Sequence, residues 1–123
     1  MNDWQAWARR LADDLTKQGV LSDPEWQTAF AAVPRHRFVP RFYRDKTTVV
    51  NGDDPNQHEA YLDAVYADTT LVTQLAPVPG ANGLLWSTSS STMPSLMARM
   101  LELLDVTGTD RVLEIGKIGR AHV

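Results

Sequence analysis

Arg111-Val-Leu-Glu-Ile-Gly116, close to the end of the 123-residue chain, is the stretch that decides the fold. Thr107-Gly-Thr-Asp110 predicts a turn, and the apolar run after it predicts a strand from Arg111 to Ile115. In doubly wound sheets, the cofactor binds at a strand that runs into a glycine turn and then a helix. Strands that end in glycine are common, so a nucleotide-binding enzyme of another kind is an alternative. We expect an α/β fold in which residues 93–116 supply the first helix and strand of a Rossmann-like domain.

Glu114 indicates which cofactor such a strand would serve. A dinucleotide brings its pyrophosphate close to the glycine loop, where a carboxylate would repel it. S-adenosylmethionine brings a sulfonium and an ammonium group, and a carboxylate attracts both cations. Glu114 therefore favours a methyl donor over NAD.

The strand pattern stops at Gly116, where a glycine-rich loop should begin. Ile118 to Val123 match, residue for residue, the translation of a common sequencing adapter, and Lys117 fits a hybrid codon. We therefore predict that residues 117–123 are a non-native tail and that the natural protein continues past Gly116. A genuine short basic tail is the alternative interpretation.

The composition is that of a globular protein. Hydrophobic residues make up 43% of the chain, charged residues make up 22%, and the formal net charge is −3. The acidic balance gives no reason to expect a nucleic-acid partner. The absence of cysteine excludes disulfides, thiolate metal sites and a cysteine nucleophile. No secretion signal opens the chain, and no run approaches the roughly 18–20 apolar residues of a membrane span. We expect a cytoplasmic protein with no nucleic-acid or membrane partner.

Two polar clusters have simpler interpretations than a binding site. Pro34-Arg-His-Arg-Phe38 is basic and aromatic, but three basic residues in an acidic chain are weak evidence for nucleic-acid binding. We expect Arg35 or Arg37 to pair with an acid of the same domain. His58 stands near several acids without the ordered spacing of metal ligands, so we predict a solvated loop there and no metal site.

Apolar residues at helical spacing predict three helices. The first covers residues 3–18, with tryptophan, alanine and leucine along one stripe. Asp23 predicts the N-cap of a second helix, which Pro34 ends. The third is strongly apolar and covers residues 93–105.

The segments between these helices predict loops and one strand. Pro34 to Pro40, bracketed by prolines, predicts a rigid extended segment. Residues 44–60 are polar and predict a loop. Thr69 to Thr73 predicts a strand, and Gln74 to Ser90, with its prolines and glycines, predicts a further loop.

Ser87 to Thr92 is an almost unbroken run of small hydroxyl residues before the third helix. One interpretation is an N-cap, at Ser91 or Thr92, in a flexible loop. The other is a binding site, because hydroxyls and backbone N–H groups at a helix N-terminus can hold a carboxylate. Trp86, just before the run, is then a candidate substrate-binding residue that would cover the substrate.

Taken in order, these segments resemble the protein-L-isoaspartate (D-aspartate) O-methyltransferase family over roughly residues 4–116. That is about the N-terminal half of such an enzyme. Four segments carry the resemblance: Val33-Pro-Arg-His-Arg-Phe-Val-Pro40, Tyr61-Leu-Asp63, Ser90-Ser-Thr-Met-Pro94 with Ala98, Met100 and Leu104, and Val112-Leu-Glu-Ile-Gly116.

The resemblance implies transfer of a methyl group from S-adenosyl-L-methionine to a carboxylate of an isoaspartyl or aspartyl residue in a protein or peptide substrate. By resemblance, Thr92 would be the catalytic residue that contacts the substrate carboxylate, with Ser90 and Ser91 as substrate-binding neighbours. Glu114 and Gly116 would bind the methionine end of the cofactor. No strong general base is needed, because a carboxylate is already ionised at neutral pH.

The chain departs from the family pattern in places. Thr92 stands where the family has a serine. The segments 45–60 and 74–89 look longer than in the repair enzymes. These extra loops slightly favour a divergent subgroup of the family, which converts an aspartate of ribosomally made peptides to an aspartimide. We divide the chain into a helical substrate-side region, residues 1–92, a truncated methyltransferase domain, residues 93–116, and the tail.

As given, the chain is predicted to bind S-adenosylmethionine negligibly and to be inactive, because the further glycines and the ribose-binding acid would lie beyond Gly116. A non-enzymatic peptide-binding module is the alternative function. The sequence leaves the oligomeric state open.

Overall fold

The structure is a computed structural model that describes residues 3–115. Its elements, in chain order, are α1 (Trp4–Lys17), α2 (Pro24–Ala32), the 3-10 helix η1 (Arg35–Arg37), β1 (Arg41–Tyr43), β2 (Val49–Asn51), the 3-10 helix η2 (Pro55–Gln57), α3 (His58–Val65), β3 (Leu71–Pro77), β4 (Leu85–Ser91) and α4 (Pro94–Leu104). The strands form one antiparallel sheet in the order β2-β1-β3-β4. Helices and sheet together confirm the predicted α/β class.

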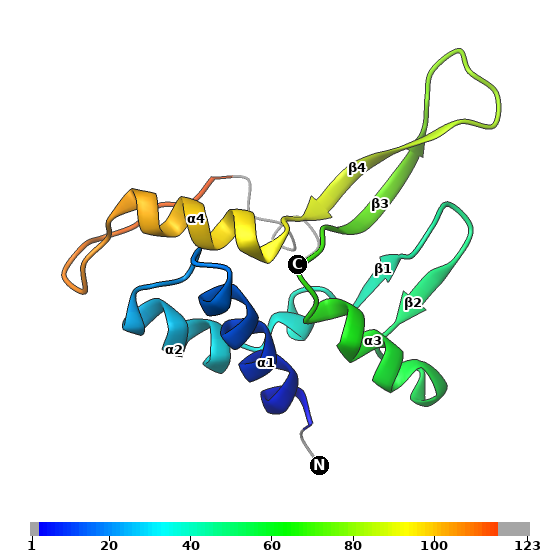
Figure 1. The fold of residues 1–123 in the computed structure, drawn as a ribbon. Helices are drawn as coiled ribbons and strands as arrows, with labels where there is room; N and C mark the ends of the chain where they lie inside the picture. The colour runs from blue at the N-terminus through cyan, green and yellow to red at the C-terminus, as the bar shows by residue number, and fades with distance from the viewer. Residues whose placement is uncertain (1–2, 116–123) are drawn as a thin grey trace.

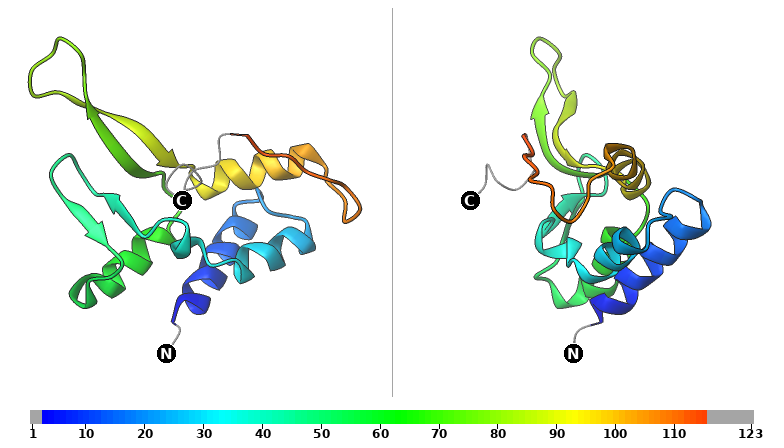
Figure 2. Two further views of the ribbon diagram at one scale, coloured as in Figure 1. Left: turned by 180° about the vertical axis from the view of Figure 1, so that it is seen from behind. Right: turned by 90° about the vertical axis from the view of Figure 1, so that its left-hand side faces the viewer.

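The helices α1, α2 and α4 gather at one end of the molecule, and α3 lies beside the β1–β2 hairpin (Figure 1). α1 and α2 lie side by side, and α4 crosses beside them (Figure 1). The β1–β2 and β3–β4 hairpins point away from this helical body. In both views of Figure 2, the β3–β4 hairpin reaches furthest out.

The core lies between the apolar stripe of α1, the inner face of α3 and the base of the sheet. Its members are fully or almost fully buried: Ala8, Leu11, Leu15, Leu21, Val39, Phe42, Val50, Tyr61, Leu62, Val65, Tyr66, Leu71 and Ala98. The i, i+3, i+4 and i+7 spacing along α1 puts its buried residues on one side, which is why this helix could be predicted from the sequence.

The predicted helices are confirmed. α1 falls within residues 3–18, and α4 falls within residues 93–105. Asp23 caps α2 as predicted, because its carboxylate accepts a hydrogen bond of 2.9 Å from the backbone N–H of Glu25.

The prediction of an extended segment from Pro34 to Pro40 is wrong at its centre. Backbone N–H groups of Arg37 and Phe38 donate to the carbonyls of Pro34 and Arg35, each at 3.0 Å, and these bonds close the 3-10 helix η1. Proline disfavours helix only in the residue before it, so the residues between the two prolines were free to turn.

Residues 44–60 are not the continuous loop that their polarity predicts. Asp45 accepts hydrogen bonds from the backbone of Thr47 and Thr48 and closes a turn between β1 and β2. The side chain of Val50, in β2, is buried in the core. α3 begins at His58, so the predicted solvated loop there is also wrong. Short strands and helices of this kind are stabilised by the elements that they pack against, so their own composition does little to predict them.

The predicted strand at Thr69–Thr73 exists, but it begins at Leu71 and runs to Pro77. The predicted loop from Gln74 to Ser90 is wrong, because most of it pairs with β3 to form β4. The turn between the strands is irregular, and Gly80 and Gly83 adopt positive φ angles of 78° and 77° there. Cross-strand pairing, rather than composition, makes the hydroxyl run a strand.

The strand predicted from Arg111 to Ile115 is not formed. Within residues 3–115 this segment pairs with no other strand, and the side chain of Leu113 is 84% exposed. A strand needs a neighbour to satisfy its backbone N–H and C=O groups, and an apolar pattern cannot supply one. The boundary between residues 1–92 and 93–116 stays a prediction.

The outer face of α4 is apolar and exposed, as expected for this helix. Leu96, Met100 and Leu103 recur along it and are 51%, 52% and 77% exposed. We predict that the chain associates as its concentration rises, because exposed apolar faces of this kind are covered in stable proteins. Sedimentation velocity at increasing concentration should show growing assemblies, and Leu103→Lys should reduce them. Glu59→Gln on α3 makes the same change in net charge and should have no effect, and a chain that stays monomeric throughout would contradict the prediction.

Candidate functional site

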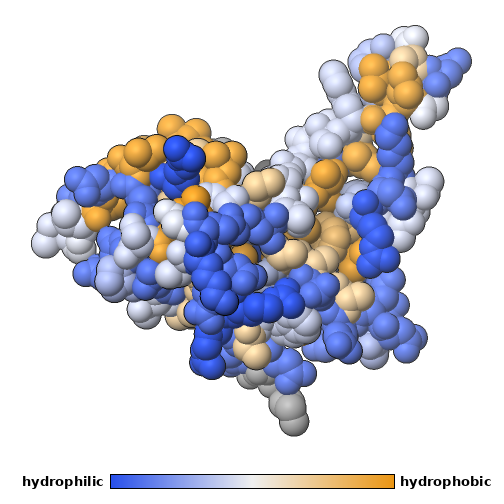
Figure 3. Space-filling model, viewed as in Figure 1, coloured by the Kyte–Doolittle hydropathy of each residue, from blue (hydrophilic) through white to orange (hydrophobic). Residues whose placement is uncertain are grey.

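An open groove of about 690 Å³ runs between α2 and α4 and ends at the junction of β4 with α4. Trp26 and Phe30 line it from α2, and Met97 and Leu101 line it from α4. Figure 3 shows apolar residues gathering over α4 and at the tip of the β3–β4 hairpin. Because Trp26, Phe30, Met97 and Leu101 form the walls of the groove, these walls are apolar, and the polar groups of the groove are concentrated at one end.

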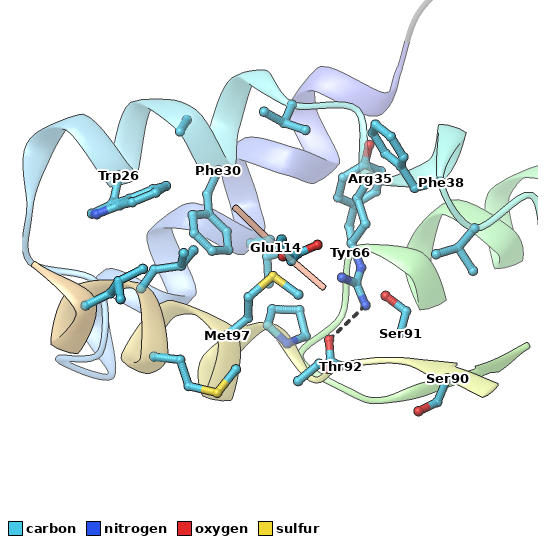
Figure 4. A pocket seen from close by; sticks show the side chains of 18 of the residues that line it. Trp26, Phe30, Arg35, Phe38, Tyr66, Ser90, Ser91, Thr92, Met97 and Glu114 are labelled. Atoms are coloured by element: carbon cyan, nitrogen blue, oxygen red, sulfur yellow. Dashed lines mark hydrogen bonds between the residues drawn. The ribbon is translucent and has the colours of Figure 1, made fainter. Parts of the chain in front are cut away.

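Ser91 and Thr92 lie at the polar end, where β4 gives way to α4 (Figure 4). Ser91 is nearly buried, with 6% of its surface exposed, and Thr92 is half-buried. Ser90 also borders the groove and is exposed. Neither Ser91 nor Thr92 is the N-cap of α4. That position is Met93, which makes no side-chain capping bond. Ser91 is not the cap because it is held in the sheet opposite Leu71.

Arg35 ties this end of the groove together from η1. Its Nε donates to the carbonyl oxygen of Val65 at 2.9 Å, and a terminal nitrogen donates to that of Thr92 at 3.4 Å (Figure 4). Burial lowers the pKa of Arg35, while Tyr66 and the negative charge of Asp68 act in the opposite direction. We expected Arg35 or Arg37 to pair with an acid. Arg35 instead bonds to carbonyls, and Asp68 attracts it through space.

Asp68 supplies the cap that the hydroxyl run does not. Its carboxylate accepts a hydrogen bond of 2.8 Å from the backbone N–H of Ser95 in the first turn of α4. Gln18, at the end of α1, donates to the same carboxylate at 3.4 Å. A residue 27 positions earlier in the chain thus satisfies the helix N-terminus and sets where Thr92 lies.

His36 and Tyr66 form a polar pair behind Arg35. The Nδ1 atom of His36 lies 2.8 Å from the Tyr66 hydroxyl, and the ring of His36 also contacts Trp4 at 5.5 Å between centroids. Burial raises the pKa of Tyr66 and lowers that of His36, and the positive charges of Arg37 and His58 lower the latter further. The folded protein therefore favours the neutral imidazole.

We predict that acid destabilises the chain through His36. Because its pKa lies below the ordinary value of 6.5 in the folded state, the unfolded chain binds the proton more readily. The contribution is fully present above that value and is lost as pH falls through the folded-state pKa. The urea midpoint should fall between about pH 7.5 and about pH 5.5, and His36→Asn should flatten this part of the profile. His58→Asn removes only one of the charges that lower the pKa of His36, so it should flatten the profile less than His36→Asn does. A His36→Asn profile equal to that of the unchanged chain would contradict the assignment.

The predicted site residues are only partly brought together. Ser90, Ser91, Thr92 and Glu114 all border the groove. Trp86 does not: it lies further out on β4, with 53% of its surface exposed.

Gly116 lies outside the described residues. The roles of all these residues in binding and catalysis stay predictions.

Arg35, Tyr66 and Asp68 were missed as parts of the site. The feature of the sequence that could have pointed to Arg35 is its place in the segment between Pro34 and Pro40. Nothing in the sequence links Asp68 to α4. Residues 3–115 hold no cluster of histidine and acidic side chains suited to a metal ion, and none of their helices is long and apolar enough to cross a membrane.

The chain is similar to known proteins of one family. The family model described as "Protein-L-isoaspartate(D-aspartate) O-methyltransferase (PCMT)" matches residues 6–119. The chain is 31% identical, over 93% of its length, to a protein-L-isoaspartate O-methyltransferase 2 of Archaeoglobus fulgidus. It is 32% identical, over 86% of its length, to a protein-L-isoaspartate O-methyltransferase of Serratia proteamaculans.

The chain spans 38% and 36% of the lengths of these two relatives. No solved structure gives a significant match. The match to the family model covers nearly all of the described residues, and it includes the groove, Thr92 and Glu114. The chain therefore belongs to the protein-L-isoaspartate(D-aspartate) O-methyltransferase family.

Proposed function

We propose that the chain is the substrate-side part of an S-adenosylmethionine-dependent O-methyltransferase that acts on isoaspartyl or aspartyl carboxylates in proteins or peptides. The observation that carries the proposal is the meeting of Ser91, Thr92 and Glu114 in one groove of a member of this family. The hydroxyls suit an anionic acceptor, and the carboxylate suits a cationic donor. The two partners of a methyl transfer thus have complementary groups at the same place.

The polar end of the groove is suited to hold a carboxylate in place. The hydroxyls of Ser91 and Thr92 can donate to its oxygens, and the guanidinium of Arg35 behind Thr92 adds positive potential. The carboxylate is already ionised at neutral pH, so the task of these residues is to orient one oxygen and exclude water. The apolar walls from α2 and α4 serve the second purpose.

The donor set of the groove also fits the proposed cofactor. Glu114 is exposed and lines the groove, so its carboxylate is free to approach an ammonium or sulfonium group. When bound, S-adenosylmethionine supplies the activated methyl group. Glu114 would hold its methionine end, together with Gly116, and Thr92 would hold the acceptor.

We predict that the 123-residue chain binds S-adenosylmethionine negligibly by itself. Glu114 is the only predicted cofactor residue among those described, and it sits on a segment with no strand partner to hold it in place. Calorimetric titration with the cofactor should give no measurable heat of binding, and a radiolabelled methyl group should not be transferred to an isoaspartyl peptide. Micromolar binding would show that residues 1–123 already form the cofactor site.

The proposed function is tested at the gene. The source DNA should be sequenced across codon 116 with a different library chemistry, and the product of the reading frame should be assayed for methyl transfer to an isoaspartyl peptide. Methyl transfer that Thr92→Val abolishes and Thr92→Ser preserves would support the proposal. A frame that stops after codon 123, with a product that binds peptide but transfers no methyl group, would replace it with a non-enzymatic peptide-binding module.

A further inference from the structure

The outer edge of β4 runs along a projecting arm and pairs with no strand of residues 3–115. β3 and β4 are each seven residues long, and their hairpin stands away from the helical body (Figures 1 and 2). In the sheet order β2-β1-β3-β4, β4 is the last strand among the described residues. A terminal strand presents every second pair of its backbone N–H and C=O groups to whatever lies beside it.

The outer part of this edge, from Leu85 to Ser87, lacks the features that usually keep an edge strand from pairing. β4 reads Leu85-Trp-Ser-Thr-Ser-Ser-Ser91 and contains neither a charged residue nor a proline. Natural proteins usually place lysine, proline or a bulge on such an edge to prevent pairing with other chains. The register shifts of this hairpin lie where Val72 to Leu75 face Ser87 to Ser90, so the irregular stretch of β4 is inward of Ser87. The outer pairs, from Leu75–Ser87 to Pro77–Leu85, are regular.

The hydrogen-bond pattern identifies the backbone groups that face outward. Val78 donates to the carbonyl of Leu84 at 3.0 Å, so the backbone of Leu84 points toward β3. Ala76 is paired with Trp86, and Pro77 with Leu85. Because the direction alternates along an antiparallel pair, Trp86 also points toward β3, and the N–H and C=O groups of Leu85 and Ser87 point away from it.

The same strand leads directly into the groove. Ser90 and Ser91 are its last residues, and Thr92 follows them. Five residue steps separate Ser87 from Thr92, which is at most about 17 Å at the rise of a strand, because the register shifts lie in this stretch. An extended peptide paired with Ser87 would therefore reach Thr92 within about five or six of its own residues.

We propose that β4 binds the peptide substrate by strand addition: a segment beside the acceptor residue pairs with the outer edge at Leu85 and Ser87, and the acceptor carboxylate lies at Thr92. This inference rests on the proposed function and specifies how the substrate is recognised. Main-chain pairing supplies affinity without reading side chains, which suits substrates of varied sequence. Trp86 and Leu84, 53% and 51% exposed, provide an apolar surface for a flanking side chain. A peptide is favoured over a second copy of the chain because the edge continues into the groove.

The test uses the isotopically labelled 123-residue chain and the capped peptide Ac-Val-Thr-Val-isoAsp-Gly-Val-Thr-NH2. Titration should shift the amide signals of Leu85 and Ser87 and slow the exchange of these two amide protons with solvent. Two further probes carry backbone N-methyl groups on alternate residues, one probe for each alternate set. Only one edge of the peptide can pair, so one methylated probe should lose about tenfold or more in affinity and the other should bind nearly normally.

Two variants at one position test the edge of the protein itself. Ser87→Pro removes the outward N–H and should weaken binding about tenfold, whereas Ser87→Ala keeps the N–H and should bind normally. If Ser87→Pro does not fold, as judged by its amide spectrum, the pair of methylated probes decides the question alone. Equal affinity of the two methylated probes, or amide shifts confined to α2 and α4, would overturn the proposal. Protected Leu85 and Ser87 amides in a dimer without peptide would overturn it in favour of a second copy.

The same titration separates this inference from the proposed function. Replacing isoaspartate in the probe by alanine should leave the changes on β4 and remove those at Thr92. Changes on β4 that persist without any response at Thr92 to either probe would support strand addition and count against the carboxylate site. A response at Thr92 that depends on isoaspartate, without changes on β4, would support the carboxylate site and contradict strand addition.

Discussion

Replacing Arg35 with methionine is expected to lower the free energy of unfolding by about 3 kcal/mol, because buried acceptors that lose their donor cost about 1–3 kcal/mol each. The guanidinium donates to the carbonyls of Val65, at the end of α3, and Thr92, in the link between β4 and α4. Methionine fills much of the same volume but donates nothing. Urea denaturation followed by circular dichroism measures the loss, and the amide signals of Ser91 and Thr92 should shift in the folded variant.

Two further variants test whether hydrogen bonding causes this effect. Arg37→Met changes an exposed arginine in the same turn and should alter stability by less than about 0.5 kcal/mol. Arg35→Lys keeps the charge but lacks the planar fork that reaches both carbonyls, so it should give an intermediate loss. If Arg35→Met and Arg37→Met have the same urea midpoint, Arg35 does not hold the end of the groove.

Replacing Gly52 with alanine is expected to lower the free energy of unfolding by about 2–3 kcal/mol, the usual cost of adding atoms to a packed site. A Cβ there would lie 2.7 Å from the Tyr61 ring and 3.0 Å from the Pro40 carbonyl oxygen. Tyr61 has no room to retreat, because it is buried and its hydroxyl lies 2.7 Å from the carbonyl oxygens of both His36 and Val39, which share its one proton. The thermal midpoint and urea denaturation both measure the change.

Gly108 provides the matched control for this substitution. A Cβ at Gly108 would meet nothing within 4 Å, so Gly108→Ala should leave stability unchanged or slightly higher. Equal effects at the two positions would mean that backbone freedom, rather than the contact with Tyr61, explains the loss. Gly52→Ala combined with Tyr61→Leu, which removes the clashing ring atoms, should cost less than the sum of the two single changes.

The helices α1, α2 and α4 could be predicted because the information for them is local. The stripe of α1 and the cap of α2 at Asp23 each depend on residues within a few positions of one another. The family resemblance was also readable, since it depends on short segments and their order. The hydroxyls near Thr92 were singled out for the same reason.

The arrangement around Thr92 could not be predicted, because its supports come from distant parts of the chain. Arg35 lies 57 positions before Thr92, and Asp68 lies 27 positions before the Ser95 amide that it caps. No periodicity or spacing connects residues that meet only after α3, β3 and β4 have packed. The prediction of a local N-cap at Ser91 or Thr92 failed because sheet pairing had already committed Ser91 to β4.

The sequence by itself determined α1, α2 and α4, the α/β class and the residue types that suit a carboxylate and a cationic methyl donor. Tertiary structure alone decided that the hydroxyl run is an edge strand, that Arg35 and Asp68 hold the junction with α4, and that residues 111–115 form no strand among the described residues. The physical reason is the range of the interactions. Helix periodicity and capping act within one or two turns, whereas strand pairing and buried hydrogen bonds require partners that only the folded chain brings near.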